Sequence, residues 1–180
     1  MKVICYGDSN TYGYDPRSYI GGRYPAGARW VDLLAEKTGW EVVNHGMNGR
    51  EIPEQSISVP DDTGLLIVML GTNDLLQGAG AAEVAERMDR FMRGLLQDRE
   101  KILLIAPPPL QPGEWVAGQE LIGQSVRLAE AYRALALRLG IGFADAGKWR
   151  ISLCFDGVHF TEDGHRAFAG RLVKTLQTGN

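Results

Sequence analysis

The sequence predicts an α/β fold, a three-layer α/β/α sandwich built around a five-stranded parallel sheet. Its strongest strand signals, at 65–70 and 102–106, are continuous aliphatic runs, which is typical of parallel strands covered by helices on both faces. Segments of helical periodicity separate the successive apolar runs. The length of 180 residues suits one domain with a core of its own, so residues 1–180 are expected to form a single unit.

In the first half of the chain, glycines and prolines mark where the expected elements end. A β-prone run at 3–6 stops at Gly-Asp-Ser, and 41–44 predicts a short second strand. The segment 11–27 is too irregular for an element, whereas helical periodicity runs over 28–39. Two prolines make 51–63 a loop or a marginal helix.

In the second half, strands and helices alternate with stronger signals. After the third strand, 81–97 predicts a helix whose apolar residues recur every three or four positions. The fourth strand stops at the prolines 107–109, and a stiff loop leads to a helix over 120–139. A short strand at 142–144 precedes a loop and a final helix that begins at Thr161. We expect the flavodoxin-like strand order 2-1-3-4-5, whose ligand crevice opens between strands one and three.

The composition is that of an ordinary soluble globular protein, with 44% hydrophobic and 23% charged residues and a net charge of −3. Scattered arginines balanced by acids argue against a nucleic-acid surface. No apolar run approaches the roughly 18 residues of a membrane span, and the first run is too short for a signal peptide. We therefore expect a cytoplasmic protein with no nucleic-acid or membrane partner.

The cysteines and histidines predict neither a disulfide framework nor a metal site. Cys5 lies in the first strand and is interpreted as a small buried hydrophobe. Cys154 stands close to Asp156 and is a candidate for the site without a catalytic role. No two histidines have a metal-type spacing such as HExxH, so we predict no metal and no cofactor, and interpret His45 and His165 as structural.

Residues with the chemistry of acyl transfer stand in loops where predicted strands end. Ser9 is the candidate nucleophile, and His159 and Asp156 are the candidate base and its orienting carboxylate. The backbone N–H groups of Ser9 and Gly49 and the side-chain amide of Asn73 are candidate oxyanion donors. Each residue alone also suits a turn, a helix cap or a helix flank. Their occurrence together, in a usable order, favours the catalytic interpretation.

Four blocks of the chain resemble those of the SGNH (GDSL) hydrolase superfamily. They are Gly-Asp-Ser-Asn-Thr at 7–11, Asn-His-Gly-Met-Asn-Gly at 44–49, Gly-Thr-Asn-Asp at 71–74 and Asp-Gly-Val-His at 156–159. They follow the superfamily's order, and the resemblance covers 3–165. It implies a flavodoxin-like sandwich, no metal, and the catalytic and oxyanion roles given above for the same residues.

Within the superfamily, three motifs are similar to the arylesterase and acyltransferase branch: Pro-Pro-Pro-Leu at 107–110, the Gly-Thr-Asn-Asp block at 71–74 and Asp-Gly-Val-His-Phe-Thr at 156–161. This resemblance implies a small-molecule ester as substrate and leaves a homo-oligomer open, because members of the branch often oligomerise. One departure is Asn10, where many members carry an aliphatic residue. Ser9 lacks Gly-x-Ser-x-Gly surroundings, so the lipase fold built on that elbow is not expected.

A second group of residues supplies candidates for the substrate pocket. They are Asp8, Asn10, Tyr12, Trp30, Trp115 and Cys154. Asp8 is interpreted first as a structural carboxylate that bonds loop N–H groups, and not as an acid catalyst. The aromatic candidates, together with Tyr14, either line the pocket or cover the core or a subunit contact, and the sequence favours neither.

The sequence therefore predicts a serine esterase that hydrolyses, or transfers, small or short-chain acyl groups through an acyl-enzyme. The segment 111–118 is expected to narrow the mouth of the site. Three alternatives stay open: a carbohydrate O-acetyl esterase with the same site, a non-catalytic α/β module that binds an anion, and a structural subunit of an oligomer.

Overall fold

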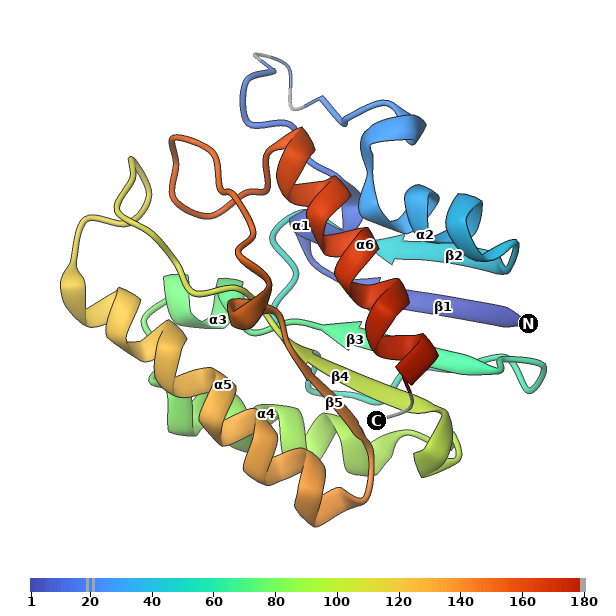
Figure 1. The fold of residues 1–180 in the computed structure, drawn as a ribbon. Helices are drawn as coiled ribbons and strands as arrows, with labels where there is room; N and C mark the ends of the chain where they lie inside the picture. The colour runs from blue at the N-terminus through green and yellow to red at the C-terminus, as the bar shows by residue number, and fades with distance from the viewer. Residues whose placement is uncertain (19, 21, 179–180) are drawn as a thin grey trace.

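The computed structural model describes residues 1–18, 20 and 22–178 and shows a parallel sheet between two layers of helices (Figure 1). Its five strands are β1 (Lys2–Gly7), β2 (Glu41–Gly46), β3 (Leu65–Met69), β4 (Ile102–Ala106) and β5 (Gly142–Asp145). They pair in the order β2-β1-β3-β4-β5, and each pairing is parallel. The predicted sandwich and its strand order are confirmed.

Two pairs of long helices cover the two faces of the sheet (Figure 1). On one face α2 (Trp30–Thr38) packs against α6 (Glu162–Thr178). On the other face α4 (Ala81–Gly94) packs against α5 (Gln119–Leu139). Across the described residues, no helix combines the length and apolarity needed to cross a bilayer.

Shorter helical segments connect these elements. Two of them follow strands closely, α1 (Ser9–Tyr12) after β1 and α3 (Thr72–Leu76) after β3. The others are the 3₁₀ turns η1 (Ala26–Ala28), η2 (Arg99–Lys101) and η3 (Ala146–Trp149). Because α1 and α3 follow strands directly, they stand at the carboxyl edge of the sheet, where the candidate residues lie.

Both faces of the central strands are apolar because alternate residues of a strand point to opposite sides of a sheet. Leu66 and Val68 of β3 pack in the cluster under α4 and α5, whereas Ile67 and Met69 pack in the cluster under α2 and α6. All four side chains are buried. The unbroken aliphatic run in the sequence is therefore the signature of a strand with two covered faces.

The structure corrects the ends of two predicted helices. The helix expected to reach residue 97 ends at Gly94, where Leu95 turns to an extended backbone with ψ 133°. The helix expected from residue 28 begins at Trp30, after the 3₁₀ turn η1. The segment 51–63, expected as a loop or a marginal helix, runs as a loop.

Candidate active site

The residues that follow β1, β2 and β3 meet the loop before α6 around one small cavity. Its volume is about 240 Å³, and its lining residues are Ser9, Tyr14, Asn48, Gly49, Asn73, Trp115, Val158 and His159. They come from segments far apart in the sequence. The fold thus brings the candidate nucleophile, base and oxyanion donors into one place, because parallel strands end at the same edge of the sheet.

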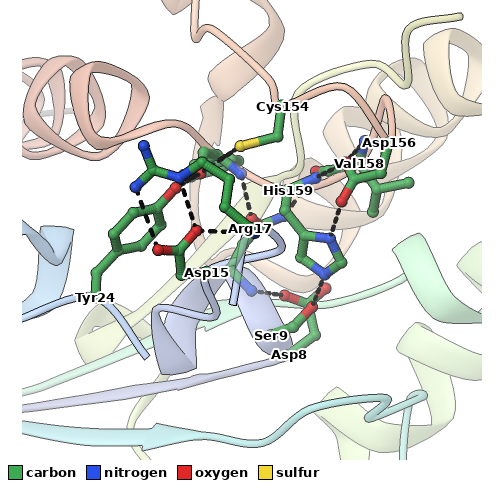
Figure 2. A network of polar contacts seen from close by, with 11 residues as sticks. Asp8, Ser9, Asp15, Arg17, Tyr24, Cys154, Asp156, Val158 and His159 are labelled. Atoms are coloured by element: carbon green, nitrogen blue, oxygen red, sulfur yellow. Dashed lines mark hydrogen bonds and ion pairs between the residues drawn. The ribbon is translucent and has the colours of Figure 1, made fainter. Parts of the chain in front are cut away.

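Ser9, His159 and Asp156 form a continuous chain of polar contacts (Figure 2). Ser9 Oγ lies 2.9 Å from His159 Nε2, and His159 Nδ1 lies 2.7 Å from Asp156 Oδ2. All three side chains are buried. When Nδ1–H is donated to the carboxylate, Nε2 keeps the lone pair that accepts the serine proton. The arrangement has the geometry of an activated nucleophile.

The loop that carries Asp156 keeps this carboxylate ionised. Asp156 Oδ1 accepts the backbone N–H groups of Val158 and His159, each at 2.9 Å. Burial acts to raise the pKa of Asp156, but the hydrogen bonds from the His159 ring and from the two N–H groups outweigh burial and lower the pKa below its ordinary value. An ionised Asp156 is the state that orients and stabilises an imidazolium.

Ser9 is the first residue of α1, and Asp8 caps this helix. Asp8 Oδ1 accepts the N–H of Asn10 at 2.9 Å, and Gly13 closes the helix in a left-handed conformation with φ 90°. Asp8 is 1% exposed, and this burial raises its pKa to about 6, with the N–H bonds opposing the rise. The capping contact agrees with the structural interpretation of Asp8.

The cavity also carries candidate donors for a negatively charged oxygen. Gly49 has φ 71°, a left-handed conformation that residues with a Cβ seldom adopt, and a Cβ at this position would meet open space. Asn73 Nδ2 donates one hydrogen to the carbonyl oxygen of Arg50 at 3.0 Å. The second hydrogen of this nitrogen has no acceptor among the described residues.

Arg50 ties the loop of Gly49 to the end of β1. Its Nη1 donates to the carbonyl oxygen of Gly7 at 2.9 Å and also to that of His45. Its guanidinium lies 4.2 Å from the centre of the Tyr6 ring. Because the Arg50 carbonyl also accepts from Asn73, this one residue connects both candidate donors to β1.

Two aromatic rings flank the imidazole of His159. The centre of the Tyr14 ring lies 4.7 Å from that of the imidazole at an interplanar angle of 57°, and the Trp115 ring lies 5.1 Å away at 82°. Trp115 is 53% exposed, so it forms the rim of the cavity. The backbone N–H of Trp115 donates to the carbonyl oxygen of Asp156 at 3.1 Å, which ties the loop after β4 to the loop before α6.

A sequence profile of the GDSL-like Lipase/Acylhydrolase family matches residues 5–167. The chain belongs to this family. The matched range contains all four blocks that resemble the superfamily and nearly the whole sheet. No curated protein matches the chain in sequence.

Solved structures of similar fold include esterases. An aryl esterase of M. smegmatis is 25% identical with a TM-score of 0.83, and Est24, a carbohydrate acetylesterase of Sinorhizobium meliloti, is 25% identical with a TM-score of 0.82. A protein of Agrobacterium tumefaciens str. C58, provisionally described as an arylesterase, is 30% identical with a TM-score of 0.82. Each comparison covers 98% of both chains. The fold of this GDSL-like family member is that of SGNH hydrolases.

Trp30 lies in the core of this family member, which corrects its assignment to the pocket. The side chain is 0% exposed, and its ring centre lies 4.8 Å from that of Phe168 in α6. Its indole N–H donates to the carbonyl oxygen of Asn10 at 3.0 Å. A tryptophan at the first position of α2 thus fills the space between α2, α6 and the sheet.

The other pocket candidates outside the cavity lining are Asp8, Asn10, Tyr12 and Cys154. Asp8 and Asn10 are buried outside the cavity lining, and both are hydrogen-bonded to the chain there. The Tyr12 ring lies 4.4 Å from the Arg23 guanidinium, and Cys154 Sγ lies 3.7 Å from the Tyr24 hydroxyl (Figure 2). Of the six candidates, Trp115 is the one in the lining.

The sequence did not single out Asn48 and Val158 as lining residues, and it left Tyr14 undecided between several surfaces. Val158 precedes His159 and Asn48 precedes Gly49, so both stand in tight loops beside residues that were predicted. Adjacency to a candidate residue in such a loop was the available signal. No pattern in the sequence shows which way the Tyr14 ring turns.

His165 has the structural character expected for it. It is fully buried, its ring packs against those of Tyr24 and Phe160, and its Nδ1 accepts the N–H of Trp30 at 3.3 Å. Burial lowers its pKa to about 3, which makes this histidine neutral at ordinary pH. It lies in the core beside the site and not in the cavity lining.

Clusters of metal-ligating side chains and a second cavity are two other places where a ligand could bind. Within residues 1–18, 20 and 22–178, no three His, Cys, Asp or Glu side chains gather as metal ligands. A larger cavity of about 700 Å³, lined by charged residues such as Glu51, Glu83 and Arg87, has no serine, cysteine or histidine in its lining. The smaller cavity beside Ser9 is therefore the candidate site. A reaction without a metal or cofactor stays a prediction.

Proposed function

We propose that this chain is a serine esterase that cleaves small or short-chain acyl esters through an acyl-enzyme on Ser9. The observation that carries the proposal is the unbroken contact from Ser9 Oγ through His159 to Asp156, with steps of 2.9 Å and 2.7 Å, beside an open cavity. Membership of an acylhydrolase family supports the same chemistry.

In the first half-reaction, Ser9 Oγ attacks the carbonyl carbon of the ester while His159 Nε2 takes the hydroxyl proton. Asp156 stabilises the imidazolium that forms. The tetrahedral intermediate then collapses, the bond between the carbonyl carbon and the alkoxy oxygen breaks, and His159 returns the proton to the leaving alcohol. The acyl group stays on Ser9 as an ester.

In the second half-reaction, a water molecule or an acceptor alcohol enters in place of the departed alcohol. His159 takes its proton as it attacks the acyl carbon, the bond to Ser9 Oγ breaks, and the proton passes to Ser9. Water yields the carboxylic acid, and an alcohol yields a new ester. Both half-reactions need the same base in the same place.

The negative oxygen of each tetrahedral intermediate needs fixed donors. We assign this role to the backbone N–H groups of Ser9 and Gly49 and to the second hydrogen of Asn73 Nδ2. Each such donor lowers the barrier by about 2.7–4 kcal/mol in comparable sites. The positive φ of Gly49 and the contact from Asn73 to Arg50 support this assignment.

The size of the cavity supports a small substrate. Its volume of about 240 Å³ is below the range of roughly 300–1,000 Å³ typical of pockets for drug-sized ligands. Tyr14, Trp115 and Val158 supply apolar lining, which suits an alkyl or aryl group next to the ester.

A carbohydrate O-acetyl esterase is the second candidate. The half-exposed Trp115 ring at the rim is a surface on which a sugar ring can stack, and Est24, of similar fold, is a carbohydrate acetylesterase. A substrate panel separates the two candidates. An aryl or alkyl esterase hydrolyses phenyl acetate faster than acetylated xylo-oligosaccharides, and a carbohydrate esterase shows the opposite order.

Hydrolysis of 4-nitrophenyl acetate tests the proposal itself. The parent is expected to turn over the ester, and Ser9→Ala is expected to lose about 10⁴-fold or more in kcat. Ser56→Ala, which changes an exposed serine, is the matched control and should keep the parent's rate. Turnover by Ser9→Ala at the parent's rate would contradict the proposal.

A further inference from the structure

Asn10 is 4% exposed and lies outside the cavity lining. Its backbone N–H, its backbone carbonyl, its side-chain oxygen and its side-chain nitrogen each form a hydrogen bond. Its backbone N–H donates to Asp8 Oδ1 at 2.9 Å, and its carbonyl oxygen accepts the indole N–H of Trp30 at 3.0 Å. Its side-chain Oδ1 accepts the N–H of Phe160 at 2.9 Å. Its Nδ2 donates to the carbonyl oxygen of Val158 at 3.1 Å.

The two side-chain contacts of Asn10 lie on either side of His159. Val158 and Phe160 are the chain neighbours of His159, so the amide holds the peptide groups before and after the base. A primary amide is planar, and its donor and acceptor keep a fixed relation. The pair of contacts therefore restrains both the position and the orientation of the segment.

Asn10 is also the residue that follows Ser9 in α1. It is attached covalently to the nucleophile at one end and hydrogen-bonded around the base at the other. We propose that Asn10 is a positioning residue that sets the distance between the Ser9 hydroxyl and the His159 imidazole, a role that rests on the proposed esterase function.

Apart from the contact between Ser9 and His159 itself, the other hydrogen bonds that the structure describes for this segment do not reach α1. The N–H of Cys154 donates to the carbonyl oxygen of His159 at 2.7 Å, and Asp156 accepts from the same loop, so these contacts set the loop's own shape. The Tyr24 hydroxyl donates to the carbonyl oxygen of Phe160 at 3.3 Å from a different loop. Asn10 ties the shaped loop to the helix of the nucleophile.

Loss of the amide leaves the buried Phe160 N–H and Val158 carbonyl without their partners. Such groups are costly, so the segment shifts until they find other partners. A shift of about 1 Å in a reacting group can slow a reaction about 10²-fold. Because His159 serves in both half-reactions, both slow together, and KM changes little while kcat falls.

The test is Asn10→Leu, which keeps the approximate volume and removes both contacts. Steady-state kinetics with 4-nitrophenyl acetate is normalised to active sites titrated with a fluorophosphonate, so misfolded protein does not count. We expect kcat per titrated site to fall about 10²-fold with KM close to the parent's. A role confined to stability would lower the melting temperature and leave kcat per site unchanged.

Gln124→Leu is the matched control. Gln124 accepts the N–H of Ala81 and donates to Glu120, both at 2.8 Å, so its removal also deletes two side-chain contacts, but on the α4–α5 face. It is expected to lower the melting temperature and to keep the parent's kcat per site. Asn10→Asp serves if Asn10→Leu does not fold, because it keeps the shape and the contact to Phe160 but presents an oxygen to the Val158 carbonyl.

Parental kcat per titrated site in folded Asn10→Leu or Asn10→Asp overturns the inference and leaves the esterase proposal standing. Failure of the parent to react with the fluorophosphonate overturns the esterase proposal, and the role of Asn10 falls with it. A lower kcat per site at unchanged KM, absent from Gln124→Leu, supports the role of Asn10.

Discussion

Two carboxylates beside the nucleophile are each 1% exposed, yet the pKa of one is raised and the pKa of the other is lowered. Asp156 accepts the imidazole and two backbone N–H groups, which outweigh burial and lower its pKa. Asp8 accepts backbone N–H groups, but burial outweighs them and raises its pKa to about 6. The different balance of burial and hydrogen bonds suits Asp156 to support a base and Asp8 to cap α1.

Asp156→Asn is expected to remove support for the imidazolium and to favour the wrong tautomer of His159. By analogy with other serine hydrolase triads, kcat should fall about 10⁴-fold with KM little changed. Asp163→Asn, at the exposed start of α6, is the control and should keep the parent's kcat. A loss of less than tenfold in Asp156→Asn would remove Asp156 from the proposed mechanism.

Asp8 is expected to make the protein less stable as pH rises. Because its folded pKa of about 6 lies above the ordinary value of 3.8, the folded state binds more protons than the unfolded state between these values. Its favourable contribution is present below pH 3.8 and is lost as pH rises through about 6.

Asp8→Asn lacks this titration but keeps an oxygen that can cap α1. The free energy of unfolding of Asp8→Asn minus that of the parent should increase by up to about 3 kcal/mol from about pH 4 to about pH 7. Urea unfolding at several pH values measures the difference. Parallel stability curves for the two proteins would contradict the raised pKa.

At the scale of elements, the long helices and the strands could be predicted because many residues contribute to each periodic pattern. The helices α1 and α3 have four and five residues, too few for a pattern, and they were not predicted. Their existence depends on local features, such as the Asp8 cap of α1. The same limit explains the shifted ends at Gly94 and Trp30, where turns continue or precede the helix.

Much of the candidate site followed from the order of the strands. Parallel strands that end at one edge bring Ser9, Gly49 and Asn73 together whatever their separation in the sequence. The direction in which an aromatic side chain points could not be predicted from the order of the strands. Trp30 packs into the core and Tyr14 turns toward the cavity, and both directions depend on the placement of loops and helices that no single-residue pattern records.

The loop after β2 gives a prediction about the oxyanion donors. Arg50→Met removes the contacts from the guanidinium to the carbonyl oxygens of Gly7 and His45, so Gly49 and Asn73 lose their connection to β1. We expect kcat to fall about tenfold or more, because a hydrogen bond to a charged group contributes about 1.5–3 kcal/mol.

Arg93→Met is the control for Arg50→Met, since the contact of Arg93 to Asp89 lies on the surface of α4. It should leave kcat unchanged. Michaelis–Menten kinetics on both variants, at equal folded concentration, makes the comparison. Equal kcat values in Arg50→Met and the parent would show that the loop is held without the guanidinium.

At the scale of the whole molecule, two tryptophans separate stability from substrate contact. Trp30→Ala empties a fully buried position between α2 and α6 and should lower the free energy of unfolding by about 3–5 kcal/mol. Trp115→Ala changes a residue that is 53% exposed and should alter KM while the free energy of unfolding moves by less than about 1 kcal/mol. Urea unfolding and ester kinetics on both variants measure the contrast. The reverse pattern would exchange the two assignments.

The assembly and location of the protein stay predictions at this scale. The sequence leaves a homo-oligomer open and predicts a cytoplasmic location. Sedimentation of the purified chain measures the first, and fractionation of the native host measures the second.

The most direct test of the central claim is intact mass after reaction with a fluorophosphonate probe. The parent should gain the mass of one adduct and Ser9→Ala should gain none, which would establish an activated serine at the carboxyl end of β1. No adduct on the parent, under conditions that label a known serine esterase, would contradict the claim and favour a non-catalytic module that binds an anion.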